Sequence, residues 1–422
     1  MAFQRVTDDG CLTSQAIHDA VTEAMSALDM TGKRVLVLIP DQTRSMPMPT
    51  VFRALVDSVA RRADRMDVLV ALGTHPPLTP EALAKHLGFG SPEALRAYAP
   101  RNVAFHNHAW DDPDALVEVG VMEADEIARI SGGLLRESAA VEVNRRATEC
   151  DLILIAGPVF PHEVVGFSGG NKYLFPGISG PQILHLFHWL GALLTNMAIN
   201  GTKHTPVREV VDRAAAMVPV EKRCLAFNVT GDRCAGVYFG SPEEAWEIAA
   251  DHAARTHIVY TGRTYQRVLA IAPAMYDDLW VAGKCMYKLE PIVADGGELI
   301  IYAPHLREIS FTHGALIRRV GYHTRDYFLA RMDAFRDIPR GILAHATHVR
   351  GVGSYADGVE RCRVQVTLAT AIPEEVCKEI NLGYRDPAGI DPDAWRGAED
   401  AGCLVADHAG EVLYRPESGP PA

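Results

Sequence analysis

Histidine is the residue type in this sequence that is best suited to chemistry, with 17 copies in 422 residues. A neutral imidazole binds divalent metals, and its ordinary pKa near neutrality lets it both accept and donate a proton. Single histidines are more often structural than functional, so their neighbours decide which ones matter. Histidine, lysine, arginine and aspartate gather in four segments: 39–45, 105–112, 161–180 and 182–190.

Segment 161–180 carries five glycines and Lys172. Glycine permits a positive φ and a close approach of the backbone to a ligand, and successive N–H groups of such a loop bind anions. The segment is not a Walker A phosphate loop, because Lys172 follows Asn171 and precedes Tyr173. His162 lies ten residues before Lys172, which favours a ligand site. A solvated lysine in a glycine-rich turn is the structural alternative.

Segment 182–190 predicts a helix that carries two histidines. His185 and His188 are three residues apart, so a helix places them on one face. The pair alone is a weak metal signal, because no H-E-x-x-H motif is present and zinc would need further ligands from elsewhere in the chain.

The remaining two segments stand at the ends of predicted strands. Alternation along the strand 103–108 places His106 and His108 on one face. Asp41 and Arg44 follow the first buried strand, where their charges suit a charged ligand. Strand-end aspartate and arginine are structural about as often as they are functional, so both interpretations stay open.

The first half of the chain alternates short β-branched runs with helical patterns. This alternation predicts an α/β fold with a mostly parallel sheet that helices cover on both faces. Ligands of such sheets bind at the carboxyl ends of the strands. We therefore expect site residues in the loops after residues 40, 72, 108 and 157. The predicted strands are 34–40, 66–72, 103–108 and 151–157, and the predicted helices are 50–61, 80–87, 92–98 and 135–148.

The second half repeats the same style and predicts a second α/β domain. A helix over 241–255, begun by Ser-Pro-Glu-Glu, precedes the expected boundary. The sequence predicts an N-terminal cofactor-binding domain at 1–260 and a C-terminal α/β domain at 262–398, with the site in the cleft between them. One option is that the segment 400–422 packs back on the first domain. Predicted strands here are 267–272, 298–302 and 362–368, and predicted helices are 277–293 and 373–380.

Composition excludes several classes of protein. Lys+Arg 41 against Asp+Glu 53 gives a net charge of −12, which argues against a nucleic-acid partner. No apolar run approaches the roughly 18 residues of a membrane-spanning helix, so no membrane role is expected. The eight cysteines are scattered without a C-x-x-C motif, which fits a reduced cytoplasmic protein rather than a disulfide framework.

Segment 161–180 resembles the signature of the lactate racemase family, whose members use a nickel-pincer nucleotide. The resemblance implies that Lys172 carries this cofactor covalently, as the nickel complex of pyridinium-3-thioamide-5-thiocarboxylic acid mononucleotide. It implies that His188 ligates nickel and that His108 and His162 are the two acid/base residues. Cofactor-binding positions implied by the same resemblance are Asp41, Arg44, Ser168, Gly169 and Gly170.

Two further motifs extend the resemblance. Asp41-Gln-Thr-Arg44 resembles the family's D-x-T-R loop, where the arginine also lies beside the substrate. The segment 278–284, Asp-Leu-Trp-Val-Ala-Gly-Lys, resembles the family's substrate-binding helix and implies that Lys284 and Trp280 contact substrate. Trp-Val stands where the lactate enzyme has Tyr-Gln, and Asp stands where it has Asn. Valine forms no side-chain hydrogen bond, so we predict a substrate other than lactate.

The resemblance implies an isomerase that racemises or epimerises a small 2-hydroxy acid. Reversible hydride transfer to the cofactor would invert C2 through a 2-keto acid, while histidines move the hydroxyl proton. Cofactor-biosynthesis proteins are the implied partners. Two alternatives stay open: a hydrolase or lyase with a divalent metal bound by His106, His108, His162 and His188, or a non-catalytic cofactor-binding protein.

Overall fold

A computed structural model describes residues 3–7 and 10–417 of the chain. The protein has a mixed α/β fold whose larger sheets are mostly parallel, as the sequence predicted. It divides into two compact units that are not the predicted 1–260 and 262–398. Unit 1 comprises the described residues up to Phe160, Ser168–Leu184 and Arg208–Arg255; unit 2 comprises Pro161–Phe167, His185–Val207 and the described residues from Thr256 onward.

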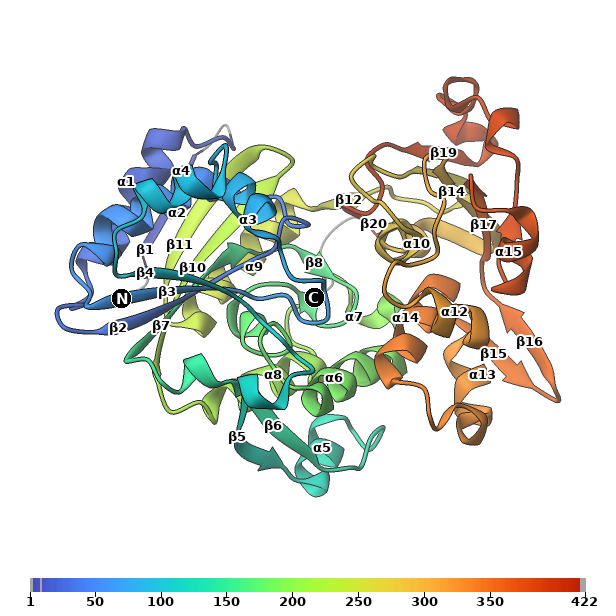
Figure 1. Ribbon diagram of the computed structural model, residues 1–422. Helices are drawn as coiled ribbons and strands as arrows, with labels where there is room; N and C mark the ends of the chain where they lie inside the picture. Colours follow the sequence, from blue (N-terminus) through green and yellow to red (C-terminus); the bar gives the residue numbers. More distant parts are fainter. Residues whose placement is uncertain (1–2, 8–9, 418–422) are drawn as a thin grey trace. The chain divides into compact units, whose positions relative to one another are not determined.

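Unit 1 is built on a seven-stranded sheet (Figure 1). Five consecutive strands run parallel, and at one edge a sixth strand is antiparallel to them and to the seventh, outermost strand. In spatial order the strands are β1 (Phe3–Val6), β11 (Arg233–Gly240), β10 (Glu221–Thr230), β7 (Leu152–Pro158), β2 (Arg34–Ile39), β3 (Arg65–Val70) and β4 (Val103–Asn107). Helices of unit 1 include α1 (Ser14–Ser26), α2 (Met48–Leu55), α3 (Pro80–His86), α4 (Pro92–Tyr98), α5 (Ala124–Ile130) and α9 (Pro242–Thr256).

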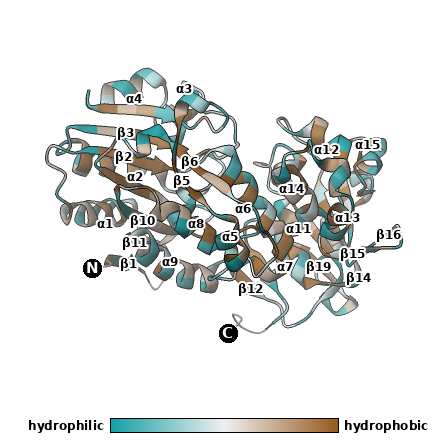
Figure 2. Cartoon of the chain, turned by 90° about the horizontal axis from the view of Figure 1, so that it is seen from below, coloured by the Kyte–Doolittle hydropathy of each residue, from teal (hydrophilic) through white to brown (hydrophobic). Residues whose placement is uncertain are grey.

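The central strands are buried on both faces. Val35 and Val37 of β2 share one apolar core with residues of α1 and α2, and the alternate residues Leu36 and Leu38 are also buried. In Figure 2 the central strands, β2 and β3 among them, show much of the hydrophobic colour. Strands that are apolar on both faces require helices on both sides, which leaves the strand ends as the places for polar side chains.

The predicted helix over 135–148 is wrong. This segment forms β6 (Ala139–Asn144), which pairs antiparallel with β5 (Leu116–Met122). Ala-Ala-Val-Glu-Val-Asn alternates between buried and partly exposed positions along most of its length, a period of two that fits a strand. The short apolar run was compatible with either structure, and pairing with a distant strand decided between them.

Unit 2 contains a five-stranded sheet in which every neighbouring pair is parallel. In spatial order its strands are β18 (Gly383–Tyr384), β17 (Gln365–Thr370), β14 (Val293–Ala303), β13 (Tyr265–Ile271) and β19 (Cys403–Ala406). A separate parallel pair joins β12 (Ile258–Tyr260) to β20 (Leu413–Arg415). Of the segment 400–422, β19 pairs with β13, and β20 pairs with β12, whose residues lie inside the predicted first domain 1–260.

The predicted helix over 277–293 is broken into three parts. These are α10 (Leu279–Ala282), α11 (Lys284–Leu289) and a 3₁₀ turn, η5 (Glu290–Ile292). Gly283 separates the two helices, and Pro291 falls inside the 3₁₀ turn. Within the described residues, no helix combines the length and apolar character that crossing a membrane requires.

Candidate functional site

The carboxyl ends of β2 and β3 bring together a buried aspartate and a histidine. Asp41, directly after β2 and only 6% exposed, accepts hydrogen bonds at Oδ1 from the Thr43 amide (2.9 Å) and hydroxyl (2.5 Å). Its other oxygen, Oδ2, lies 2.5 Å from Nδ1 of His75 in the loop after β3. Burial alone would raise the pKa of Asp41, but His75, Arg44 and Thr43 together hold that pKa well below its ordinary value. Asp41 is therefore a permanent carboxylate.

His75 has the hydrogen bonding of an acid/base residue. The Asp41 carboxylate can only accept, so it holds the ring hydrogen on Nδ1 and leaves the lone pair on Nε2 when the ring is neutral. The His75 side chain keeps 31% of its surface exposed. Its loop is anchored by the Gly73 amide, which donates to the Gly177 carbonyl (2.9 Å), and Gly73 adopts a positive φ of 55°.

His75 was missing from the residues predicted to form the site. Its position in the sequence could have identified it. Gly73-Thr-His75-Pro follows the predicted strand over 66–72, and the loop after that strand was expected to carry site residues. Asp41 lies 34 residues earlier in the chain, and only the pairing of β2 with β3 brings the two side chains together.

His108, the predicted acid/base residue, occupies a different environment. It is 3% exposed. Its Nε2 donates to the Ser179 carbonyl (3.0 Å), and its Nδ1 accepts from the side-chain amide of Asn144 (3.2 Å). Burial lowers its pKa to about 4, against a smaller opposing effect of the Ser179 carbonyl. Both ring nitrogens are thus engaged within the protein. His106 on β4 is hydrogen-bonded separately, to Asp67 at 2.8 Å.

Arg44 lies in the same loop as Asp41 and is half-buried. Its Nη1 donates to the Thr43 hydroxyl (3.0 Å), and its guanidinium carbon is 5.9 Å from the centre of the Phe160 ring. The D-x-T-R loop of the sequence thus folds so that its threonine links the carboxylate to the guanidinium.

The glycine-rich segment forms a tightly packed turn that presents Lys172. Gly169 and Gly170 adopt φ values of 83° and 58°, and a Cβ on Gly169 would lie 2.5 Å from a Val159 methyl carbon. The Ser168 hydroxyl donates to the Pro158 carbonyl (3.2 Å), so this side chain builds the turn. Lys172 follows in a 3₁₀ turn, η4 (Gly170–Tyr173), and is half-buried.

Unit 2 carries the other predicted histidines. His162, 7% exposed in β8 (Pro161–His162), accepts at Nδ1 from the Val164 amide (3.1 Å), so its neutral ring carries the hydrogen on Nε2. The Lys288 amine donates to the Pro161 carbonyl and anchors the same short strand. Glu163 Oε2 lies 3.5 Å from His162 Nδ1.

His185 and His188 belong to α6 (Pro181–Leu194) and are both half-buried. The His188 ring packs edge-to-face against Phe187 with ring centres 5.0 Å apart. Burial lowers the pKa of His185, and the charge of Arg340 lowers it further.

The lysine and tryptophan predicted to bind substrate stand on consecutive short helices. Asp278 caps α10 by accepting from the Val281 amide (2.9 Å). Trp280 is in α10, and Lys284 begins α11, with its amine 5.0 Å from the centre of the Tyr276 ring. Of the predicted site residues, unit 1 therefore holds Asp41, Arg44, His108, Ser168, Gly169, Gly170 and Lys172, and unit 2 holds His162, His188, Trp280 and Lys284.

The comparisons with known proteins agree with this set of motifs. Residues 4–199 match the family model described as the lactate racemase N-terminal domain. The lactate racemase of Thermoanaerobacterium thermosaccharolyticum is 25% identical over 309 residues, which is 69% of this chain and 65% of that protein. The lactate racemase of Lactiplantibacillus plantarum is 29% identical over 229 residues, 52% of this chain and 48% of that protein. Residues 4–199 thus carry a domain of the lactate racemase family.

Solved structures extend the likeness over nearly the whole chain. A protein of Thermotoga maritima has 30% sequence identity and a TM-score of 0.85, covering 96% of this chain and 98% of that one. The lactate racemase apoprotein of T. thermosaccharolyticum has 19% identity and a TM-score of 0.70, covering 94% and 92%, which shows a shared fold. By sequence, this chain spans less than two thirds of the length of the curated racemases that it matches.

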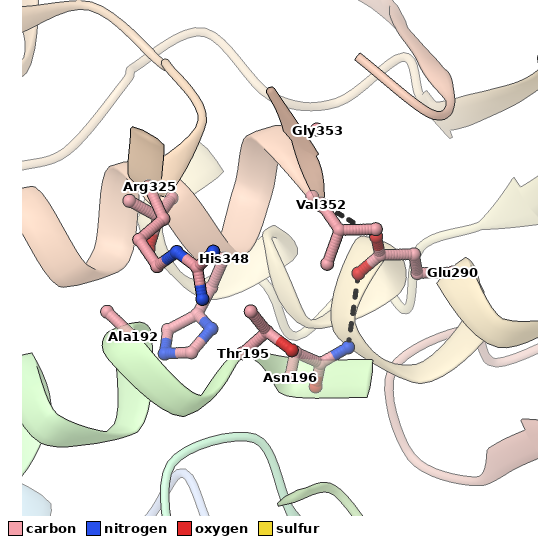
Figure 3. Close-up of a pocket in the computed structure, with 10 residues that line it drawn as sticks. Ala192, Thr195, Asn196, Glu290, Arg325, His348, Val352 and Gly353 are labelled. Atoms are coloured by element: carbon pink, nitrogen blue, oxygen red, sulfur yellow. Dashed lines mark hydrogen bonds between the residues drawn. The ribbon is translucent and has the colours of Figure 1, made fainter. Parts of the chain in front are cut away.

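A cavity of about 130 Å³ lies in unit 2, outside every motif that the sequence singled out (Figure 3). Figure 3 shows the buried Glu290 carboxylate on the wall of this cavity. The carboxylate accepts hydrogen bonds from the Val352 backbone N–H (2.7 Å) and from the Asn196 side-chain amide (3.4 Å). Burial raises the pKa of Glu290 and lowers that of His348, on the same wall, to about 4. Burial therefore disfavours the charged forms of both Glu290 and His348, which fits a structural role for this cavity.

Proposed function

We propose that this protein is a racemase or epimerase of a 2-hydroxy acid, an isomerase that depends on the nickel-pincer nucleotide, and that lactate is not its substrate. The family-model match over residues 4–199 and the similarity to two lactate racemases support the reaction class. The observation that carries the proposal is the His75–Asp41 pair beside Arg44, because it joins an oriented proton acceptor to a cation for the substrate carboxylate.

The donor groups of the chain fit this cofactor. Among the described residues, no group of three or more His, Cys, Asp or Glu side chains is arranged to hold a metal ion. A metal bound here would therefore take part of its ligands from a bound cofactor, and imidazole with sulfur donors suits nickel. Lys172 offers an amine for attachment on a turn that packing holds in place, and His188 offers a half-buried imidazole.

When bound, the cofactor would supply reversible hydride acceptance at C2, which takes the substrate through the planar 2-keto acid. The protein moves the other hydrogen. His75, held by Asp41, accepts the hydroxyl proton of one enantiomer at Nε2. His162 is assigned to the other enantiomer, and it accepts at Nε2 only in the tautomer that carries its hydrogen on Nδ1, beside Glu163 Oε2. The other imidazole then returns a proton to the oxygen of the product. In this proposal His75 takes the role that the sequence resemblance had given to His108.

Arg44 and Lys284 are the cations assigned to the substrate carboxylate. A guanidinium binds a carboxylate through two parallel hydrogen bonds and so fixes the orientation of the hydroxyl-bearing carbon. The proteins that make the cofactor are the proposed partners, because a chain produced without them would be inactive whatever its fold.

The test is a chain co-expressed with the cofactor-synthesis proteins and given single enantiomers of several 2-hydroxy acids. We expect chiral chromatography to detect inversion, and intact mass to show an adduct that Lys172→Ala abolishes together with activity. His188→Ala should keep the adduct and lose nickel. Substrate deuterated at C2 should keep most of its label in H₂O. Rapid loss of the label would indicate proton abstraction and would contradict hydride transfer.

A further inference from the structure

The glycine-rich turn of unit 1 is held from behind by side chains of two helices. Arg208 of α8 (Pro206–Ala216) and Trp246 of α9 are both buried. The Trp246 indole N–H donates to the Ser168 carbonyl (2.9 Å), and Nη1 of Arg208 donates to the Gly169 carbonyl (3.3 Å). Two consecutive carbonyls of the turn therefore accept hydrogen bonds from the helices behind it.

The Gly169 carbonyl links Arg208 to Lys172. This oxygen also accepts from the backbone N–H of Lys172 (3.2 Å), so the guanidinium and the main chain of the lysine share one acceptor. The Lys172 carbonyl in turn accepts from the Gly177 N–H (3.1 Å). A charged donor makes a stronger hydrogen bond than a neutral one, so Arg208 fixes the shared carbonyl firmly.

The positive charge of Arg208 is costly at this position. Its guanidinium carbon lies 4.1 Å from the centre of the Trp246 ring. Burial lowers the pKa of Arg208 to about 10, against the opposing charges of Asp212 and Glu243, so the side chain stays protonated near neutral pH. An apolar side chain would fill the same space without the cost of burying a charge. Packing alone therefore does not account for an arginine here.

The two carboxylates that offset this charge also hold the residue before Lys172. The side-chain amide nitrogen of buried Asn171 donates to Asp212 Oδ1 (3.0 Å) and to Glu243 Oε1 (2.6 Å). Both hydrogens of that nitrogen are used, which fixes the orientation of the side chain. Arg208, Asp212, Glu243 and Asn171, which we call the anchor network, thus hold the turn on both sides of Gly170.

We propose that Arg208 is a positioning residue for attachment of the cofactor: its buried guanidinium holds the Gly169 carbonyl so that the turn presents the Lys172 amine in the orientation that attachment requires. The inference rests on the proposed function, since it takes Lys172 as the attachment point. A reacting group keeps its orientation when a surrounding layer of hydrogen bonds holds it, and a small misplacement lowers the rate of reaction.

The attachment step itself is a condensation. The Lys172 nitrogen forms a bond to the carbon of a thiocarboxylic acid group on the cofactor, and the carbon–oxygen bond of that group breaks. The oxygen leaves as water with one hydrogen from the nitrogen and one from the sulfur, and a thioamide remains. No oxidant or reductant is needed. Arg208 contacts none of these atoms in this proposal and acts through the turn.

The first measurement is amide hydrogen exchange of the full-length apoprotein, followed by mass spectrometry. Arg208→Met removes the charge and the donors but keeps an apolar stem against Trp246. We expect exchange in peptides covering 168–174 to become at least about tenfold faster, while exchange in β7 stays within about twofold of wild type. Arg213→Met, on the same helix with 49% of the side chain exposed, is the matched control and should change neither.

Asp212 is half-buried and Glu243 is exposed, so replacing Arg208 leaves no isolated charge in the core, and Arg208→Met should fold. Arg208→Gln keeps a polar end and removes only the charge and part of the reach. It serves as the second variant, with exchange over 168–174 at least about threefold faster than in wild type. Unchanged exchange over 168–174, or an equal acceleration in β7, would overturn the inference.

The second measurement is the fraction of chains that carry the adduct, read by intact mass after co-expression with the cofactor-synthesis proteins. Arg208→Met should carry it on at least about tenfold fewer chains than wild type, and Arg213→Met on as many. An undiminished adduct in Arg208→Met, with wild type that inverts 2-hydroxy acids, would overturn the inference and leave the proposed function in place. No adduct on wild type would refute the proposed attachment, and hydrogen exchange would still decide whether Arg208 holds the turn.

Discussion

Two histidines of unit 1 follow neighbouring strands of one sheet, yet the protein treats them differently. His75, after β3, points Nδ1 at a buried carboxylate and keeps about a third of its side chain exposed. His108, after β4, is buried and has a carbonyl on one nitrogen and an amide on the other. An ionised partner stabilises a protonated ring, while burial among neutral groups opposes one. These surroundings, and not strand-end position alone, are the reason for proposing His75 rather than His108 as the proton carrier.

The largest expected effect separates the two residues by activity. In the cofactor-loaded protein, His75→Gln should lower kcat by at least about 10²-fold, the lower range for general acid–base catalysis. His108→Gln should change the kcat of folded protein by less than about tenfold, because both its nitrogens already have partners inside the fold. The measurement is the initial rate of inversion in both directions for each variant. A larger loss in His108→Gln than in His75→Gln would restore the assignment made from sequence.

The carboxylate behind His75 should have the next largest effect. Asp41→Asn keeps the shape of the side chain but removes the charge that orients the ring, so kcat should fall about 10–100-fold, as for other carboxylates that orient a histidine. An unchanged kcat in folded Asp41→Asn would contradict the orienting role of this carboxylate.

The contrast between the two histidines also explains what the sequence could predict. The strands predicted over 34–40, 66–72, 103–108 and 151–157 are local patterns, and each formed close to its predicted bounds, whereas the strands β10 and β11, antiparallel to each other, were not predicted. The role of a histidine is not local. The partner of His75 lies 34 residues away, and the partners of His108 lie 71 and 36 residues away. The wrong helix prediction over 135–148 has the same cause, because pairing with a distant strand makes this segment β6. Asn144 at the end of β6 is the residue that hydrogen-bonds His108.

The stability of the fold should depend more on His108 than on a less buried histidine of helix α1. His108→Gln disturbs two buried hydrogen bonds, so the free energy of unfolding should fall by about 1–3 kcal/mol in urea titrations. His18→Gln, on α1 with 31% of the side chain exposed, is the matched control and should change it by less than about 0.5 kcal/mol. Equal losses in the two variants would mean that the Ser179 and Asn144 contacts contribute little.

The last expected effect is the pH dependence of that stability. The pKa of His108 is about 4 in the folded protein, below the ordinary value of 6.5, so the folded ring stays neutral while the unfolded ring binds a proton below pH 6.5. The unfolded state then holds more protons, and the stability that His108 contributes is lost as pH falls from 6.5 toward 4.

Buried His345 and His348 also have lowered pKa values, so the measured quantity is the difference between the wild type and His108→Gln. That difference in unfolding free energy should shrink at up to about 1.4 kcal/mol per pH unit, the value for one proton, and then level off near pH 4. Asp41 cannot produce this slope, because its carboxyl is ionised in both states above pH 3.8 and weakens the fold only below that value. A difference that stays constant between pH 7 and pH 4 would mean that His108 titrates normally in the fold, and the distinction from His75 would then rest on geometry alone.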